Sequence, residues 1–372
     1  MEDQTVASNK DCRENRYHER MKVRISTRKT FTGAKNILIR GTNWIGDAVM
    51  TLPAVAAIRN TFPGARISIL VKPWVAEIFH LCKDVDEVIV FESPGPHSGV
   101  AGKLRLAKEL RTRRFDMAIL LQNAIEAAII SWLAGIPVRA GYNSDGRGLF
   151  LTHSVQRTEA IRKVHQIEYY LEMVKSLGCR SAEANDFLKP GQEYEILSEK
   201  LLSEHGIGRE GFVIGLAPGA TYGPAKKWFP ERFAAVADRL IDDFSAQAIL
   251  FGSNEDRKST DLVEQNSHHT LINLAGKTNL KEAIAIIARC NLFISNDSGL
   301  MHVAGALNIP TVAIFGSTNP ITTSPVGNKS IVIYKGASCS PCLRETCPTD
   351  FRCMDVISVE EVYETARGLL TK

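Results

Sequence analysis

Short, uninterrupted apolar runs alternate with longer amphipathic segments from residue 36 onward. The first half holds four such runs, which we expect to be β-strands, at residues 36–40, 66–71, 87–91 and 116–121. Between them, the segment from Gly46 to Phe62 and residues 101–113 have helical spacing. Strands that are apolar throughout and alternate with helices are typical of a parallel sheet that is covered on both faces.

A second series of the same kind begins after a polar stretch that ends in Pro190-Gly191, a pair typical of a linker. Five strands are expected in it, at residues 212–217, 246–251, 270–273, 292–295 and 311–315. The pattern predicts an α/β fold with two Rossmann-like, doubly wound domains that face each other across a cleft. A ligand is then expected at the carboxyl ends of the strands and between the domains.

The predicted organisation has four parts along the 372 residues. Residues 1–35 form a polar, basic extension that we expect to be disordered. Residues 36–190 form the N-terminal domain, and residues 191–357 form the C-terminal domain, which includes a cysteine-rich loop. Residues 358–372 form a terminal helix.

The net charge of +4 is confined to the extension, where nine Lys or Arg face five Asp or Glu; the rest of the chain has 36 of each kind. A neutral body lacks the basic face that nucleic acid requires, so no nucleic-acid partner is expected. Residues 117–138 are interrupted by polar side chains and fall short of the roughly 20 nearly uninterrupted apolar residues that span a membrane. The N-terminus has no apolar core of a secretory signal, so we expect a cytoplasmic location.

The loop directly after the first strand reads RGTNWIGD and ends in Asp47. Its glycines allow tight turns, and we expect Asp47 to lie at the mouth of the cleft. There the carboxylate would act as a general base or hold an acceptor sugar. The structural alternative is a helix N-cap, a position where Asp is also favoured. The spacing does not match the dinucleotide fingerprint G-x-G-x-x-G.

The loop at residues 218–230 combines small residues with Thr221, Lys226 and Lys227. Small residues let the backbone approach a ligand closely, while the hydroxyl and the two ammonium groups suit a phosphate. An ordinary surface loop with solvated lysines is the alternative. The order of residues is not that of a Walker loop.

The loop at residues 295–302 is again a strand end, a tight turn and a helix start. The amides of Ser298, Gly299 and Leu300 would point from the helix N-terminus toward an anion. Asp297 would bind sugar hydroxyls or cap the helix. His302 lies on the first turn, where a packed, hydrogen-bonded histidine is the more common case.

Four cysteines lie close together near the C-terminus, namely Cys339, Cys342, Cys347 and Cys353. Four thiolates can enclose a tetrahedral Zn²⁺, and the C-x2-C pair suits a structural zinc site. Unmetallated thiols, disulfides and an iron–sulfur cluster are the alternatives, with disulfides least expected in a reducing compartment. Residues 84–86 have the D-x-D pattern of metal-dependent glycosyltransferases, but their place before a strand favours a polar turn.

Four blocks of sequence together resemble glycosyltransferase family 9, the ADP-heptose:lipopolysaccharide heptosyltransferases, and most of all the lipopolysaccharide heptosyltransferases II. The blocks are ILIRGTNWIGDAVMTLPA, PGATYGPAKKWFP, LAGKTNL and NDSGLMHVAGALNIPTVAIFGSTNP. The resemblance implies a GT-B fold with the nucleotide sugar on the C-terminal domain. It also implies an inverting transfer of L-glycero-D-manno-heptose from ADP-heptose to a heptose of the lipopolysaccharide inner core. No cofactor or metal takes part in that catalysis, so zinc would be structural only.

The resemblance also assigns roles to single residues. Asp47 matches the family's base, and Lys226 matches its phosphate-binding lysine. Glu255 and Asp256 are alternatives for an acidic contact to ribose. The matches on the donor side are Thr221, Lys226, Glu255, Asp256, Gly276, Lys277, Thr278, Asp297, Ser298, Gly299, Leu300 and His302. The N-terminal extension and the four-cysteine segment depart from the better-known members.

Two other functions stay open on the sequence. One is another family 9 or GT-B enzyme with a different acceptor or nucleotide sugar, such as a UDP-sugar transferase or epimerase. The other is a non-catalytic protein that binds a nucleotide sugar, against which the joint presence of Asp47 and Lys226 argues. The acceptor would be presented at a membrane surface, which leaves peripheral contact with the inner face of the cytoplasmic membrane as an open question.

Overall fold

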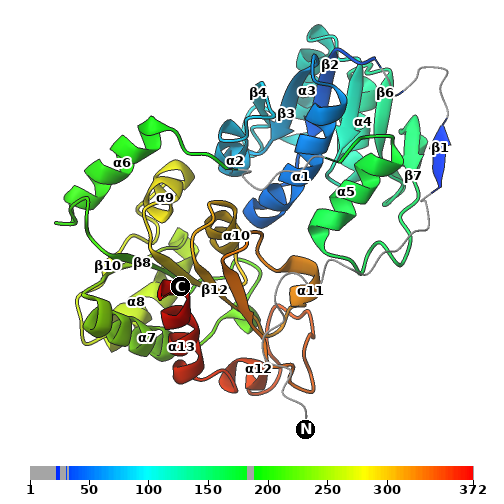
Figure 1. The fold of residues 1–372 in the computed structure, drawn as a ribbon. Helices are drawn as coiled ribbons and strands as arrows, with labels where there is room; N and C mark the ends of the chain where they lie inside the picture. Colours follow the sequence, from blue (N-terminus) through cyan, green and yellow to red (C-terminus); the bar gives the residue numbers. More distant parts are fainter. Residues whose placement is uncertain (1–21, 26–30, 32, 182–187, 372) are drawn as a thin grey trace. The chain divides into compact units, whose positions relative to one another are not determined.

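The computed structural model describes residues 22–25, 31, 33–181 and 188–371. The chain divides between Lys189 and Pro190 into two compact units, and each unit holds one sheet with helices packed on it (Figure 1). The predicted α/β class with two Rossmann-like units is therefore confirmed.

The N-terminal unit is built on a seven-stranded sheet of order β1-β7-β6-β5-β2-β3-β4, in which β1 is antiparallel to β7 and the other pairs are parallel. Its strands are β1 (Val23–Ile25), β2 (Asn36–Arg40), β3 (Arg66–Val71), β4 (Glu87–Val90), β5 (Met117–Leu120), β6 (Val138–Tyr142) and β7 (His153–Val155). Its helices are α1 (Ile45–Thr61), α2 (Ala76–His80), α3 (Gly99–Thr112), α4 (Ile125–Leu133) and α5 (Gln166–Ser176), with short 3₁₀ turns η2 (Pro73–Val75) and η3 (Arg147–Leu149). Leu38 and Leu70 pack with residues of α3 and α4, and the intervening Ile37 and Ile39 are equally buried. Both faces of the central strands are covered, which explains their continuous apolar runs.

The C-terminal unit is built on a six-stranded parallel sheet of order β10-β9-β8-β11-β12-β13. Its strands are β8 (Val213–Ala217), β9 (Gln247–Leu250), β10 (Ile272–Asn273), β11 (Leu292–Asn296), β12 (Thr311–Ile314) and β13 (Ser330–Ile333). Its helices are α6 (Gln192–Ser203), α7 (Pro230–Phe244), α8 (Arg257–Asn266), α9 (Leu280–Ile287), α10 (Gly299–Ala306), α11 (Pro320–Thr323), α12 (Arg352–Asp355) and α13 (Val359–Leu370), with 3₁₀ turns η4 (Pro224–Lys226) and η5 (Asn254–Asp256). The last helix, α13, packs against α7, and its Val362 belongs to the same core as Trp228. It is thus part of this unit and not a separate element, because its apolar face helps to cover the sheet.

Four strands, β1, β6, β7 and β13, were not predicted from the apolar pattern. Strand β6 carries Arg139 and Gly141, so it has no continuous apolar run, and its place depends on pairing with β5 and β7. Strand β1 lies in the part that was expected to be disordered, so that expectation is wrong for Val23–Ile25. Its pairing with β7 satisfies backbone groups that a bare sheet edge would leave exposed. Most of the remaining extension lies outside the described residues.

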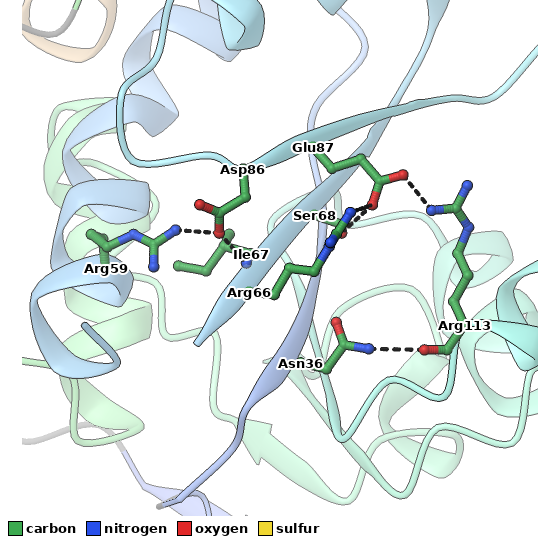
Figure 2. A network of polar contacts seen from close by, with 8 residues as sticks. All are labelled: Asn36, Arg59, Arg66, Ile67, Ser68, Asp86, Glu87 and Arg113. Atoms are coloured by element: carbon green, nitrogen blue, oxygen red, sulfur yellow. Dashed lines mark hydrogen bonds and ion pairs between the residues drawn. The ribbon is translucent and has the colours of Figure 1, made fainter. Parts of the chain in front are cut away.

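Polar contacts fix the amino ends of β3 and β4 (Figure 2). Arg59 of α1 donates to a carboxylate oxygen of Asp86 at 2.6 Å, and the Ile67 amide donates to the same oxygen at 2.7 Å. Partial burial raises the pKa of Asp86, but these hydrogen bonds outweigh it and hold the pKa below its usual range. Glu87 accepts hydrogen bonds from the side chains of Arg113, Arg66 and Ser68. Asp86 is therefore an anchor of the scaffold, which supports the polar turn over a metal-binding D-x-D at residues 84–86.

Candidate active site

Each sheet changes its direction of winding at its first long strand. Strand β2 lies between β3 and β5, and strand β8 lies between β9 and β11. Doubly wound sheets bind ligands outside the carboxyl ends of their strands at such switch points. Helix α1, which carries Asp47 in its first turn, begins after the loop that follows β2. The loop that carries Lys226 follows β8, and Asp297 follows β11 directly. The fold thus places the main candidate residues where this architecture binds ligands.

Asp47 is the third residue of α1 and is partly exposed. The N-cap of this helix is Trp44, which makes no side-chain cap hydrogen bond. The alternative that Asp47 itself is the N-cap is therefore wrong, because the helix begins two residues before it. A carboxylate in the first turn still interacts favourably with the helix dipole.

The surroundings of Asp47 include the phenol of Tyr170 on α5, which packs against α1. Burial raises the pKa of Tyr170 well above its usual value, and the negative charge of Asp47 adds to that shift. The phenol is therefore neutral at physiological pH. Asp47 therefore lies within electrostatic range of an uncharged phenol, and as a partly exposed carboxylate it can accept a proton.

Two buried arginines, which no sequence motif revealed, lie on this side of the N-terminal unit. Arg40 donates to the Gly41 carbonyl at 2.5 Å, the Leu70 carbonyl at 3.1 Å and the Asn43 side chain at 3.0 Å. Arg147 donates to the Tyr142 carbonyl at 2.6 Å and to further groups in the loop after β5. Burial lowers the pKa of each arginine to about 10. Through these hydrogen bonds, Arg40 holds the loop that follows β2, and Arg147 holds the loops that follow β5 and β6.

Lys226, Asp297 and Thr318 form one group at the switch point of the C-terminal sheet. The Lys226 ammonium donates to Asp297 Oδ2 at 2.6 Å, and the Thr318 hydroxyl donates to the same oxygen at 2.7 Å. The side chains of Lys226 and Asp297 are only 15% and 5% exposed. Asp297 is thus neither a helix cap nor a freely exposed sugar ligand in this structure; it orients Lys226. Thr318 was missed by sequence reasoning, although it lies within the GSTNP end of a block that carries the resemblance.

The side chain of Asn296 ties the Lys226 loop to the sheet. Its oxygen accepts from the Trp228 amide at 3.0 Å, and its nitrogen donates to the Pro218 carbonyl at 2.7 Å. Both ends of the loop are therefore fastened to the end of β11. Thr221 lies exposed within this loop.

The helix start after Asp297 has its cap at Ser298, whose hydroxyl accepts from the Met301 amide at 3.4 Å. Gly299 and Leu300 are the first two residues of α10, so helix geometry alone gives their amides no partner within the helix. They remain candidates for an anion. His302 is buried, as a packed histidine would be.

The structure separates the two acidic alternatives for a ribose contact. The Asp256 carboxylate accepts from the amide and the hydroxyl of Ser253, at 3.1 and 2.9 Å, and it lies 3.5 Å from the Lys227 ammonium. A Cβ on Gly219 would come within 2.2 Å of its carboxyl group, so it is also tightly enclosed. Glu255 is exposed. Glu255 is therefore the carboxylate that a ligand can reach, and Asp256 holds the turn together.

The loop of Gly276, Lys277 and Thr278 lies against this turn. A Cβ on Gly276 would lie 3.1 Å from the Cα of Asn254, and the Gly276 amide donates to the Gly252 carbonyl at 3.0 Å. The φ angle of Gly276 is +69°, a left-handed conformation that favours glycine. The Lys277 ammonium donates to the Asn273 carbonyl at 2.8 Å. The structure thus brings the turn that carries Glu255 and the 276–278 loop together.

The sequence profile of glycosyltransferase family 9 (heptosyltransferase) matches residues 103–351. The chain is 33% identical to the lipooligosaccharide heptosyltransferase 2 of Haemophilus influenzae, over 80% of this chain and 88% of that protein. This chain belongs to glycosyltransferase family 9. The resemblance drawn from the four sequence blocks is thereby confirmed.

Solved structures of family 9 share the fold. The structure of E. coli ADP-heptose LPS heptosyltransferase II superimposes with a TM-score of 0.77 at 28% identity, over 90% of this chain and 98% of that one. A family 9 glycosyltransferase from Veillonella parvula gives a TM-score of 0.81 at 26% identity, over 91% and 97% of the two chains. The match extends over both units of this family 9 chain.

Three of the four cysteines of this family 9 chain, Cys339, Cys342 and Cys347, lie in the irregular segment between β13 and α12, and Cys353 is the second residue of α12. Burial raises the pKa of Cys353, and the neighbouring Cys339, Cys342 and Cys347 raise it further, so the four thiols lie within electrostatic range of one another. Within the described ranges, however, no three His, Cys, Asp or Glu side chains are grouped so that they could hold a metal ion. The arrangement therefore offers no ready ligand set, and the zinc site stays a prediction.

Proposed function

We propose that this chain transfers L-glycero-D-manno-heptose from ADP-heptose to a heptose of the lipopolysaccharide inner core, with inversion and without a catalytic metal. The observation that carries the proposal is the Lys226–Asp297–Thr318 group at the switch point of a family 9 chain. Relatives that are 32–33% identical are named lipopolysaccharide or lipooligosaccharide heptosyltransferase 2.

The donor half of the reaction needs positive charge near the diphosphate. As the glycosidic bond breaks, the departing ADP gains negative charge, and an oriented cation in a partly buried site stabilises that charge. Lys226 is such a cation, because Asp297 and Thr318 fix its position before the donor arrives. The N-terminus of α10 adds partial positive charge. These groups supply the stabilisation that a divalent metal supplies in other transferases.

The acceptor half needs a base, because a sugar hydroxyl is a poor nucleophile until its proton leaves. We assign this role to Asp47, which stands at the corresponding switch point of the N-terminal sheet. Attack on the face opposite the departing ADP inverts the configuration at the reacting carbon. The proton passes from the acceptor hydroxyl to the Asp47 carboxylate as the new bond forms.

Mass spectrometry of a single reaction tests the proposal. Purified protein is incubated with ADP-heptose and a panel of truncated inner-core acceptors, and one acceptor should gain the mass of one heptose. A UDP-sugar in place of ADP-heptose should give no product. Transfer from the UDP-sugar alone would favour the alternative GT-B activity, and binding of ADP-heptose without any product would favour a non-catalytic binding protein.

We also propose peripheral contact with an anionic membrane surface through α3. Val100 and Leu104 on this helix are 77% and 50% exposed, and Lys108 and Arg111 follow at the same helical spacing. Residues so spaced share one face, which joins apolar to basic side chains and suits an anionic lipid surface. None of the described helices has the length and apolarity needed to cross a membrane. Lys108→Glu should reduce sedimentation with phosphatidylglycerol vesicles; equal sedimentation of variant and wild type would exclude α3 as the contact.

The four thiols are not grouped as a metal site in the described structure, and we propose that a structural zinc ion would draw them together as thiolate ligands. Such an ion would contribute to folding and not to catalysis. Protein purified without a histidine tag should then contain close to one zinc per chain. A content below about 0.2 zinc per chain, with four thiols titratable after mild unfolding, would identify the cluster as unmetallated thiols.

A further inference from the structure

Residues 339–353, here called the cysteine segment, lie in a stretch that has no role in the proposed chemistry. Residues 334–351 contain neither helix nor strand. Irregular loops longer than about 12–15 residues are uncommon in compact domains unless they serve a function. The contacts of this segment indicate what that function is.

The cysteine segment is bonded to the loop that carries Lys226. The Tyr222 hydroxyl donates to the Leu343 carbonyl at 2.8 Å, and the Ala225 amide donates to the Glu345 carbonyl at 3.0 Å. Gly223 packs so closely that a Cβ there would lie 2.3 Å from the Glu345 carbonyl oxygen. The Tyr222 ring lies 5.1 Å from the Lys226 ammonium, a cation–π contact. Tyr222 thus touches both the reactive cation and the cysteine segment.

The same segment is bonded to the loop that carries Thr318. The Leu343 amide donates to the Ser317 carbonyl at 2.8 Å, and the Ser340 hydroxyl donates to the Gly316 carbonyl. Cys353 also packs against this loop, since a Cβ on Gly316 would lie 3.1 Å from its sulfur. The cysteine segment is therefore hydrogen-bonded both to the loop that carries Lys226 and to the loop that carries Thr318, whose side chains meet at Asp297.

Two thiols also fix the shape of the segment itself. The Cys347 sulfur accepts a hydrogen bond from the Phe351 amide at 3.4 Å and contacts the Thr349 hydroxyl at 3.5 Å. Cys353 is buried in the core of the unit. Cys347 and Cys353 thus take part in the contacts that hold the backbone of the segment in place.

We propose that the cysteine segment is a brace that positions Lys226 and Thr318 around Asp297, so that donor turnover depends on it although none of its residues contacts the reacting atoms. The proposal rests on the proposed function of Lys226 at the donor diphosphate. Tyr222, Leu343 and Glu345 are positioning residues in this scheme: they act through Lys226.

A double-mutant cycle of Tyr222→Phe and Lys226→Ala tests the brace. Tyr222→Phe keeps the ring beside Lys226 and removes only the hydrogen bond to Leu343. We expect kcat/KM for ADP-heptose to fall about threefold to tenfold, the usual effect of one lost hydrogen bond. In the Lys226→Ala background the same change should have no further effect, because coupled residues are not additive. An equal loss in both backgrounds, or no loss in either, overturns the proposal.

A matched control is Tyr363→Phe, which removes the hydrogen bond between Tyr363 on α13 and Asp243 on α7 in the same unit. It should leave kcat/KM unchanged; a loss equal to that of Tyr222→Phe would show general destabilisation and overturn the brace.

A second test changes a glycine at the contact itself. Gly223→Ala should push the loops apart and lower kcat/KM at least tenfold, whereas Gly208→Ala, with no atom within 4 Å of its new Cβ, should not. Wild-type kinetics in Gly223→Ala would also overturn it. Absence of turnover in the wild type would contradict the proposed function instead.

Discussion

The loops after β2 and β8 occupy equivalent places in their two sheets but treat charge differently. In the N-terminal unit the buried cation Arg40 donates to two backbone carbonyls and to the side-chain amide oxygen of Asn43. In the C-terminal unit Lys226 is held by the carboxylate of Asp297. The first arrangement fixes a loop. The second holds a cation in a fixed orientation, and on that ground we propose that the C-terminal unit binds the donor diphosphate.

The largest expected effect is at Asp47. Asp47→Asn keeps the size of the side chain but removes the base, so kcat should fall by about 10²–10⁴-fold, the usual contribution of a positioned base. Because Asp47 is not the N-cap of α1, the melting temperature should change little. Steady-state kinetics and thermal melting check this. A variant with near-normal kcat and a lowered melting temperature would make Asp47 a structural residue.

Lys226→Ala should weaken turnover of ADP-heptose at least tenfold, which corresponds to about 1.4 kcal/mol of lost transition-state stabilisation. Lys227→Ala is the matched control, since the Lys227 ammonium is held by Ser259 at 3.0 Å and lies near Asp256. Its effect should be smaller. Equal losses of kcat/KM in the two variants would show that the phosphate contact has been assigned to the wrong lysine.

Glu255 and Asp256 should separate ligand binding from stability. Glu255→Gln is expected to raise the KM for ADP-heptose a few fold, about 1 kcal/mol for one hydrogen bond to ribose, with no change in melting temperature. Asp256→Asn should lower the melting temperature, because the Ser253 amide and hydroxyl lose a charged acceptor. If the KM effect appears only in Asp256→Asn, the assignment of the ribose contact is reversed.

The smallest expected effect is that of EDTA. Since Lys226 and the start of α10 supply the charge for the leaving group, brief addition of EDTA to the assay should leave the initial rate unchanged. Loss of activity that magnesium restores would establish a catalytic divalent ion. The contrast between the two loops would then no longer explain how the leaving group is stabilised.

The sequence determined much of this picture by itself. The continuous apolar runs placed the central strands of both sheets, because strands buried on both faces must be apolar along their whole length. Motif spacing placed Asp47, Lys226 and Asp297 after strands, and the topology then assigned those strands to switch points. These are local features, so a local pattern can reveal them.

Tertiary structure decided the rest. Strand β6, with Arg139 and Gly141, is a strand only because its neighbours pair with it. The choice between Glu255 and Asp256 needed Ser253 and Gly219, which lie on two different loops. The sequence likewise could not show that Asp297 pairs with Lys226, 71 residues away along the chain, or that the cysteine segment is bonded to both donor-side loops. Such contacts join residues far apart in sequence, and only the folded backbone brings their atoms within hydrogen-bonding distance.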